Sequence, residues 1–119
     1  MAKDIRVALV TTLRAMPAQM LESFVEWHLS TGFSTIYLYF DDPSDRGVDV
    51  AMKLLQSAVR RGRHADCIRV TRCDEQLRHE WTSLTTFAQH GGGREDRMVE
   101  ARQMLNAEHA LRRAHAARA

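Results

Sequence analysis

The stretch EWHLSTGFSTIYLYFDDPSD, residues 26–45, decides the fold. It joins the end of a helical pattern to Gly32, then to six strand-forming residues at 35–40, and then to a loop dense in turn formers at 41–47. Glycine tolerates the left-handed conformation that ends many helices, whereas Ile, Tyr and Phe favour strands. The stretch therefore predicts a helix, a strand and a polar loop in that order.

The segments on either side continue this alternation. Residues 5–13 are rich in Val, Ile, Leu and Thr, and the apolar residues among them run on rather than alternate, which predicts a strand buried on both faces. Helical stripes follow Pro17 and run from Val48 to Val59, and a short third strand is expected over 67–71. Strands that alternate with helices through short links indicate an α/β fold with a parallel sheet and flanking helices.

The chain beyond Arg72 has weaker patterns. Residues 75–87 suit a short helix or irregular structure, and HGGGR at 90–94 is expected to be a flexible connector because it lacks the Lys-Ser/Thr of a phosphate loop. Asp96 is expected to cap a last helix. The apolar side of that helix is predicted to consist of Ala101, Met104, Leu105, Ala107, Leu111 and Ala114. The basic residues over 112–118 are expected to form a solvated face.

The composition is that of one small globular domain, residues 1–119. A net charge of +2 argues against a dedicated nucleic-acid binder. The apolar run Val7–Val10 is too short for a membrane span. Cys67 and Cys73 have no zinc-ligand spacing, so no structural metal site is expected.

Two polar segments follow the ends of the first two predicted strands. The first is Thr11–Arg14, and the second holds the carboxylates and hydroxyl of Asp41, Asp42, Ser44 and Asp45. Ligands of open parallel sheets bind beyond the carboxyl ends of the strands, and acceptors of this kind suit a nucleobase or ribose. The alternative is a polar turn that only caps the following helix.

Residues 26–45 resemble the signature of family 92 and related family 2-like glycosyltransferases of the GT-A type. Those proteins have an acidic residue, an aromatic residue and His, then Gly-Phe, an aromatic-rich strand and an Asp-Asn-x-Ser-x-Asp loop. Asp41, Ser44 and Asp45 match that loop, and Asp42 replaces its Asn. Residues 102–111 are similar to the helix that precedes the metal-binding Asp-x-Asp stretch. The resemblance covers residues 5–60 and 96–115.

The resemblance implies the Rossmann-like nucleotide-binding half of a GT-A fold, incomplete in this chain. A full-length relative would transfer a sugar from a nucleotide-sugar donor, expected to be UDP-linked, to a hydroxyl acceptor. Thr11 and Thr12 would line the nucleotide, Asp41 would accept from the base or ribose, and Gln103 would lie near the donor. Arg14 stands in place of the family's Asn-Glu pair, where it would either pair with a phosphate or lie on the surface.

The resemblance also implies Mn²⁺ or Mg²⁺ in a full-length relative. This chain contains no Asp-x-Asp at a strand end after residue 49, and no general base can be assigned. We therefore expect little or no transferase activity from it alone, and self-association through an exposed sheet edge. Relatives with an anchor lie in the Golgi or endomembranes, and the cytoplasm is the alternative. A non-catalytic α/β module that binds a nucleotide or a protein is the alternative function.

Several single residues carry expectations of their own. His28 is expected to be a core histidine bonded to a neighbouring backbone group, and both Trp27 and Trp81 are expected to be buried rather than to stack on a ligand. Cys67 is predicted to be buried, and the neighbouring Arg72 is predicted to lower the pKa of Cys73. The methionines are expected to fill the core, namely Met52, Met98 and Met104.

Overall fold

The computed structural model describes residues 6–91 and 99–118, and it contains a three-stranded parallel sheet. The strands are β1 (Val7–Leu13), β2 (Phe33–Phe40) and β3 (Ile68–Arg72), with β2 in the middle. The predicted α/β fold with a parallel sheet and flanking helices is confirmed.

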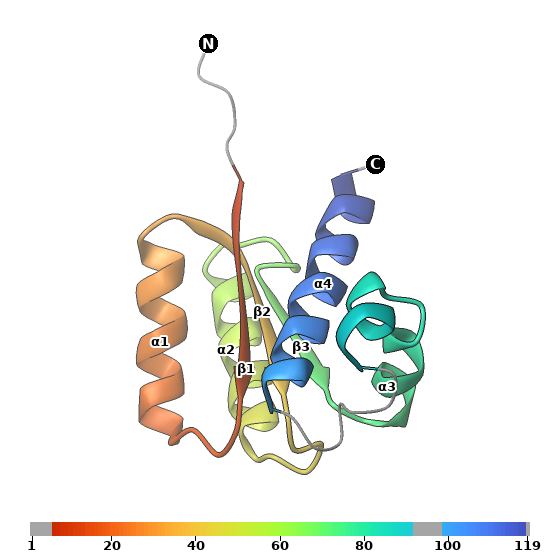
Figure 1. Cartoon of the computed structure of the whole chain (residues 1–119). Coiled ribbons are helices and arrows are strands. Elements are labelled where there is room, and N and C mark those ends of the chain that lie inside the picture. Colours follow the sequence, from red (N-terminus) through yellow and green to blue (C-terminus); the bar gives the residue numbers. More distant parts are fainter. Residues whose placement is uncertain (1–5, 92–98, 119) are drawn as a thin grey trace.

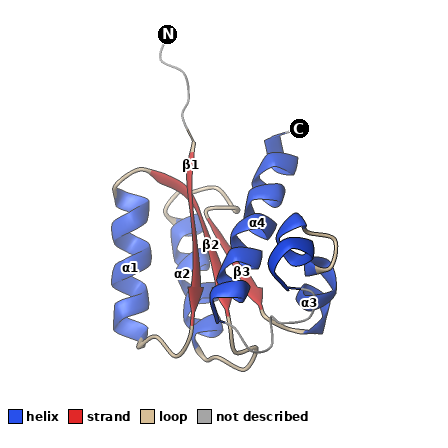
Figure 2. Cartoon of the chain, in the orientation of Figure 1, coloured by secondary structure: helices blue, strands red, loops and turns tan. Residues whose placement is uncertain are grey.

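Helices cover both faces of the sheet (Figure 1 and Figure 2). On one face lie α1 (Ala18–Ser30) and α2 (Gly47–Arg60). On the other lie α3 (Glu75–Trp81), the π-helical segment η1 (Phe87–Gly91) and α4 (Val99–Arg118). Helix α4 runs opposite to the strands, so it begins at their carboxyl ends. The start of β1 and the end of α4 lie together at the opposite end of the molecule (Figure 1).

The alternation of side chains along β2 divides the buried residues into two cores. Ile36, Leu38 and Phe40 pack against α1 and α2, where they join Leu21, Val25 and Leu29. Tyr37 and Tyr39 point the other way, toward α3 and α4. The last five side chains of β2, at positions 36–40, are all buried, so this part of β2 has both faces covered.

The prediction that the first strand is buried on both faces is wrong. Val7 is 44% exposed, and only Leu13 of β1 is fully buried. The reason is its place in the sheet. In the part of the chain that the structure describes, β1 pairs with β2 alone and forms one edge. Its run of four apolar residues, Val7–Val10, therefore lies on an edge strand.

The predicted apolar side of the last helix is also partly wrong. Met104 and Leu111 are 44% and 68% exposed, and Ala107 is exposed as well. The buried side of α4 combines small or apolar residues with polar ones: Ala101, Arg102, Leu105, Asn106, His109 and Ala110. Arg102, Asn106 and His109 hydrogen-bond to Asp41, Thr12 and Tyr39, so the buried side of α4 is not the purely apolar one. Among the described residues, Oδ1 of Asn106 has no partner. The expected cap Asp96 and the expected core residue Met98 lie outside the described residues, as do residues 92–94.

Two further expectations of burial fail, one at an aromatic residue and one at a methionine. Trp81 is fully buried as predicted, but Trp27 is 61% exposed on the outer side of α1. Met52 is 41% exposed, so it does not fill the core. His28 makes the predicted contact with a neighbouring backbone group, since Nδ1 lies 2.6 Å from the carbonyl oxygen of Phe24, but its side chain is only half-buried and is not part of the core.

Both thiols are buried, as predicted for Cys67. The predicted lowering of the Cys73 pKa is wrong, because burial raises the pKa of this thiol and outweighs the opposing charge of Arg78. Burial likewise raises the pKa of Cys67.

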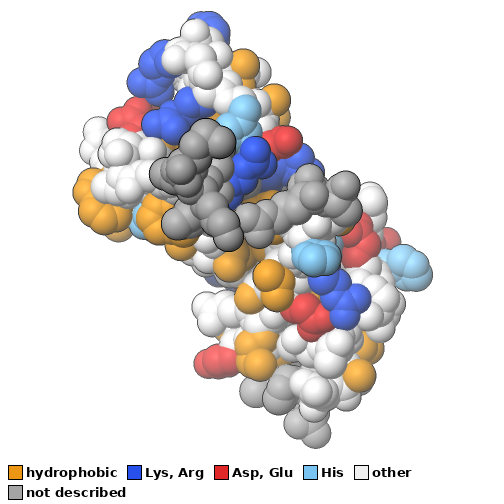
Figure 3. All heavy atoms as spheres, turned by 90° about the horizontal axis from the view of Figure 1, so that it is seen from above, with side chains coloured by type: hydrophobic (Ala, Val, Ile, Leu, Met, Phe, Trp, Pro, Cys, Tyr) orange, Lys and Arg blue, Asp and Glu red, His pale blue; other side chains and the backbone are white. Residues whose placement is uncertain are grey.

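The surface seen from above mixes side chains of every type (Figure 3). Basic side chains there lie among acidic and hydrophobic ones, so this view presents no uniformly basic surface. Among the described residues, no helix combines the length and the apolar character that a membrane crossing requires.

Candidate functional site

The carboxyl ends of β1 and β2 lie side by side. Leu13 is the register partner of Phe40, and the backbone N–H of Asp41 donates to the carbonyl oxygen of Leu13 at 2.9 Å. The loops that leave these strands therefore begin at the same edge of the sheet. This brings together the two polar segments that the sequence places after the first two strands.

Asp41 is clamped between two guanidinium groups. Arg102 donates to it twice, through Nε at 2.6 Å and through a terminal nitrogen at 3.0 Å, and Arg14 donates at 3.0 Å. The side chains of Asp41 and Arg102 are 6% and 10% exposed, whereas that of Arg14 is 69% exposed. A bidentate pair of this kind has a fixed geometry. Asp41 therefore ties the start of α4 to the end of β2 and holds Arg14 at the surface.

The other two carboxylates organise the loop itself. Asp45 accepts from the backbone N–H of Ala15 and of Gly47, each at 2.8 Å, and Asp42 accepts from the N–H of Ser44 at 2.9 Å. Ala15 has a positive φ of 53°, an uncommon conformation for a residue with a side chain. Asp45 thus links the loop after β1 to the first turn of α2, as a capping turn does.

Gly47 is a residue that the sequence patterns did not single out. A Cβ atom there would lie 2.7 Å from Cε1 of Phe40, whose ring is buried. Only glycine lets the backbone pass this close to the ring. The glycine thereby fixes where α2 begins, next to the acidic loop.

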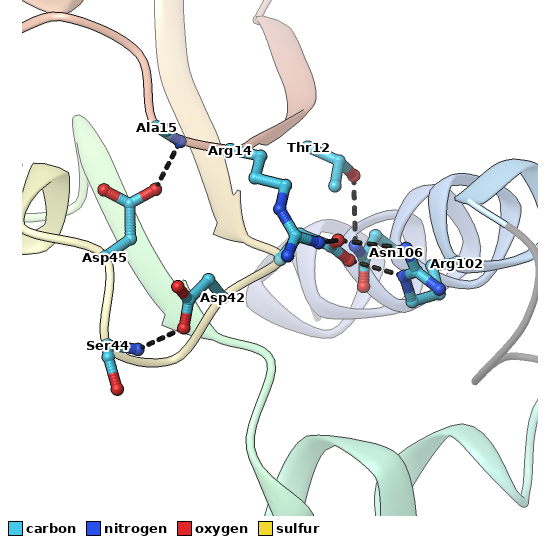
Figure 4. Close-up of polar contacts among 9 residues, drawn as sticks. Thr12, Arg14, Ala15, Asp42, Ser44, Asp45, Arg102 and Asn106 are labelled. Carbon is cyan, nitrogen blue, oxygen red and sulfur yellow. Dashed lines mark hydrogen bonds and ion pairs between the residues drawn. The ribbon is translucent and has the colours of Figure 1, made fainter.

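A cleft of about 370 Å³ lies between these two loops. It brings together four of the residues predicted for the site, Arg14, Asp42, Ser44 and Asp45, and its remaining lining is Ala15, Met16, Ala18, Arg46, Gly47 and Val50. The close-up in Figure 4 shows Asp42, Ser44 and Asp45 on one side of Arg14, with Arg102 and Asn106 on the other. The cleft therefore offers the guanidinium of Arg14 opposite carboxylate and hydroxyl acceptors.

The remaining predicted site residues lie elsewhere. Thr12 accepts from Nδ2 of Asn106 at 3.0 Å on the α4 face, and strand alternation turns Thr11 toward the opposite face. The two threonines therefore cannot line one pocket together. Gln103 is exposed on α4, beside the buried Arg102. The structure thus places Thr12 and Gln103 on the α4 side and Thr11 on the opposite face, all three outside the lining of the cleft.

The sequence patterns missed a polar row on α4, defined by Arg102, Asn106, His109 and Arg113. The spacing of three or four residues places all four on one side of the helix. The ring of His109 lies between two partners: Nδ1 is 2.7 Å from the Tyr39 hydroxyl oxygen, and Nε2 is 2.8 Å from a carboxylate oxygen of Glu80. The spacing of these four polar residues could have revealed the row from the sequence. The apolar residues between them instead suggested that another side of α4 is buried.

The expectation of a solvated basic face over residues 112–118 is wrong at Arg113, the last member of the polar row. Arg113 donates to the Thr71 hydroxyl at 2.9 Å, and its guanidinium lies 5.5 Å from the ring centroid of Tyr37. Burial raises the pKa of the nearby Tyr39, which stays a neutral phenol. Arg113 is therefore part of the contact between α4 and the sheet.

The cation that the resemblance implies has no cluster of three candidate ligands among the described residues. Within residues 6–91 and 99–118, no three His, Cys, Asp or Glu side chains lie close enough to hold a metal ion. The oxygens of Asp41 face two guanidinium groups, and those of Asp45 accept from backbone N–H groups.

Comparison with protein-family models finds no match to this chain. Comparison with curated proteins and with solved structures finds no match either.

Proposed function

We propose that the cleft between the loops after β1 and β2 binds a nucleotide diphosphate. The chain would then be the Rossmann-like nucleotide-binding half of a GT-A glycosyltransferase domain, with a UDP-linked sugar as donor and a hydroxyl group as acceptor in a full-length relative. The observation that carries this proposal is the position of Arg14. It is largely exposed at the carboxyl edge of a parallel sheet, on the lip of a cleft whose other side is acidic.

The side chains of the cleft suit the parts of a nucleotide. The guanidinium of Arg14 can pair with phosphate oxygens through two parallel N–H groups. Asp42 and Ser44 offer acceptors for the N–H of a base or for ribose hydroxyls. A volume of about 370 Å³ lies within the range of ligand pockets. In this arrangement Asp41 positions Arg14 and does not itself contact the nucleotide.

Binding without turnover is the expected behaviour of this chain alone. Its described residues do not hold a cation for the diphosphate leaving group, and no residue is placed as the base for an acceptor hydroxyl. The second candidate is a non-catalytic α/β module that binds a nucleotide in the same cleft. The two candidates share the cleft and differ in whether a further segment completes a transferase.

Isothermal titration with UDP, without metal, tests the binding site. We expect saturable one-to-one binding and a melting temperature that rises with UDP concentration. Arg14→Ala should weaken binding by about tenfold or more, equivalent to about 1.4 kcal/mol. Arg60→Ala is the matched control, because Arg60 is also exposed but ends α2 far from the cleft, and it should bind UDP as the unaltered chain does.

Two outcomes would overturn the proposal. The first is an unaltered chain that does not bind UDP, and the second is equal weakening by both arginine substitutions, which would indicate general charge attraction. A separate assay follows release of UDP from a UDP-sugar in the presence of Mn²⁺. No turnover is expected, and sustained turnover would contradict the expectation that this chain is inactive alone.

A further inference from the structure

The free edge of β1 exposes a row of backbone groups. The carbonyl of Leu13 accepts from Asp41 in the loop after β2, so the amide groups of odd-numbered residues of β1 point toward β2. Those of Ala8, Val10 and Thr12 consequently point to the other side. No described strand pairs there, so this edge can hydrogen-bond to another strand.

This edge lacks the features that usually prevent pairing. Exposed edge strands commonly carry charged residues or proline, or they are short. The sequence of β1, VALVTTL, has seven residues and no charge. The other edge strand, β3, has five residues and includes Arg69 and Arg72. The two edges of the sheet therefore differ, and only β1 offers an uncharged partner surface.

An apolar groove extends this edge onto α4. Its volume is about 270 Å³, and it is lined by Ala8, Leu9, Val10, Tyr37, Ala107, Ala110, Leu111 and Ala114. Leu111 is 68% exposed and Val7 44% exposed. Apolar side chains of this size in water lose about 1.5–3 kcal/mol relative to full burial. The occupant of the edge should therefore cover the groove as well.

We propose that a second copy of this chain occupies the edge through antiparallel pairing of the two β1 strands. A two-fold axis at Val10 places Ala8 opposite Thr12 of the second copy and Val10 opposite its counterpart. The outward-facing groups at 8, 10 and 12 are symmetric about this axis, as an isologous contact requires. The product is a continuous six-stranded sheet with both α4 helices on one face, where Leu111 of each copy faces the other.

The size of the contact suits a dimer. A seven-residue strand is about 23 Å long, and a sheet between two helix layers is about 30 Å deep. The footprint is therefore about 700 Å² per copy, close to the roughly 800 Å² of a standard interface. Pairing of β1 with β3 of another copy would leave free edges at both ends and give open chains, and the charges on β3 oppose it.

Light scattering during size-exclusion chromatography, without nucleotide, tests the dimer. The unaltered chain should elute with twice the monomer mass at high concentration. Leu111→Lys adds a charge at an exposed position and should raise the dimer dissociation constant by about tenfold or more. Met52→Lys is its control, because Met52 is also exposed but lies on α2, and it should leave the dimer unchanged.

A second pair of variants addresses the strand edges. Val10→Pro removes an N–H that points to the free edge and leaves the hydrogen bonds to β2 in place, so it should give a folded monomer by circular dichroism. Val70→Pro removes the corresponding outward N–H of β3 and should remain dimeric. A monomeric unaltered chain, a dimer that survives both Leu111→Lys and Val10→Pro, or a dimer lost only in Val70→Pro would each overturn the proposal.

Discussion

Both faces of the sheet have an apolar core, but the α4 face adds a row of polar contacts to it. On one face, Ile36, Leu38 and Phe40 pack against apolar side chains of α1 and α2. On the other, the polar row of α4 meets polar groups of the strands, as in the contacts of Asn106 with Thr12 and of His109 with Tyr39. Apolar burial supplies stability without direction, whereas hydrogen bonds require particular partners.

The difference indicates how the position of α4 is specified. Sliding the helix by one turn would keep alanines and leucines near the sheet but would separate the buried members of the polar row from their partners. A buried polar group without a partner costs about 1–3 kcal/mol. The register of α4, and with it the location of Arg102 beside Asp41, is therefore fixed mainly by polar contacts.

The largest expected effect lies on the apolar face. Leu38 is fully buried at the centre of β2, so Leu38→Ala should lower the free energy of unfolding by about 2–5 kcal/mol, measured by urea denaturation. Val59 is 42% exposed on α2, and Val59→Ala should change it by about 0.5 kcal/mol or less. Equal losses in both variants would refute the assignment of this face as the main apolar core.

The second-largest loss of unfolding free energy is expected from a substitution that breaks the polar contact at the start of α4. Arg102→Ala leaves the buried Asp41 with Arg14 alone and should cost about 3 kcal/mol of unfolding free energy. Replacing both members, Asp41→Leu with Arg102→Met, should recover most of that loss, because it removes the buried charge together with its partner. A double variant as unstable as Arg102→Ala would contradict this explanation.

A smaller effect depends on pH and concerns the contact between Glu108 of α4 and residues 85–86. Glu108 accepts from the backbone N–H groups of Thr85 and Thr86 at 3.0 and 2.7 Å. A hydrogen bond from the Thr86 side chain, followed by these backbone bonds and the charge of Arg112, lowers the pKa of Glu108 from 4.5 to about 2. A lowered folded pKa stabilises the protein above the unfolded value, and this contribution is lost as pH falls from about 4.5 toward 2. Glu108→Gln should cost about 1–2 kcal/mol at neutral pH.

The control for that pH effect is the unaltered chain. Its unfolding free energy should fall more steeply with acidification below pH 4.5 than that of Glu108→Gln. If the unfolding free energies of the two proteins fell equally with acidification, Glu108 would have no special role in holding residues 85–86 to α4.

The smallest effect concerns the exposed partner of the same carboxylate. Arg14 binds Asp41 as Arg102 does, but its side chain is 69% exposed. Arg14→Ala should therefore change the unfolding free energy by about 1 kcal/mol or less. The comparison with Arg102→Ala isolates burial as the cause, and it ensures that any loss of UDP binding in Arg14→Ala does not come from unfolding. A loss equal to that of Arg102→Ala would refute this distinction.

The sequence predicted the fold well wherever a segment obeys a single period. The strand at 35–40, the glycine that ends α1 and the stripe of α2 follow from local patterns that tertiary packing reinforces. Gly32 has a φ of +113°, as a helix-ending glycine should. These elements depend on apolar burial, which a linear pattern records directly.

The same approach failed where long-range polar contacts decide burial. Nothing near Asp41 in the sequence reveals that Arg102, on α4, will neutralise it. The edge position of β1 depends on strand order, and a run of apolar letters does not encode strand order. Of the candidate site, the sequence located the acidic loop and Arg14, but it could not tell that Thr11 and Gln103 would lie away from the cleft.

The placement of the chain's two ends has a practical consequence. The first residues of β1 and the last turn of α4 leave the molecule on the side away from the loops that follow the strands (Figure 1). A tag, a fused protein or a sensor surface attached at either end would therefore leave the cleft beside Arg14 facing free solution. Immobilised chains should accordingly remain accessible to small ligands whichever end carries the attachment.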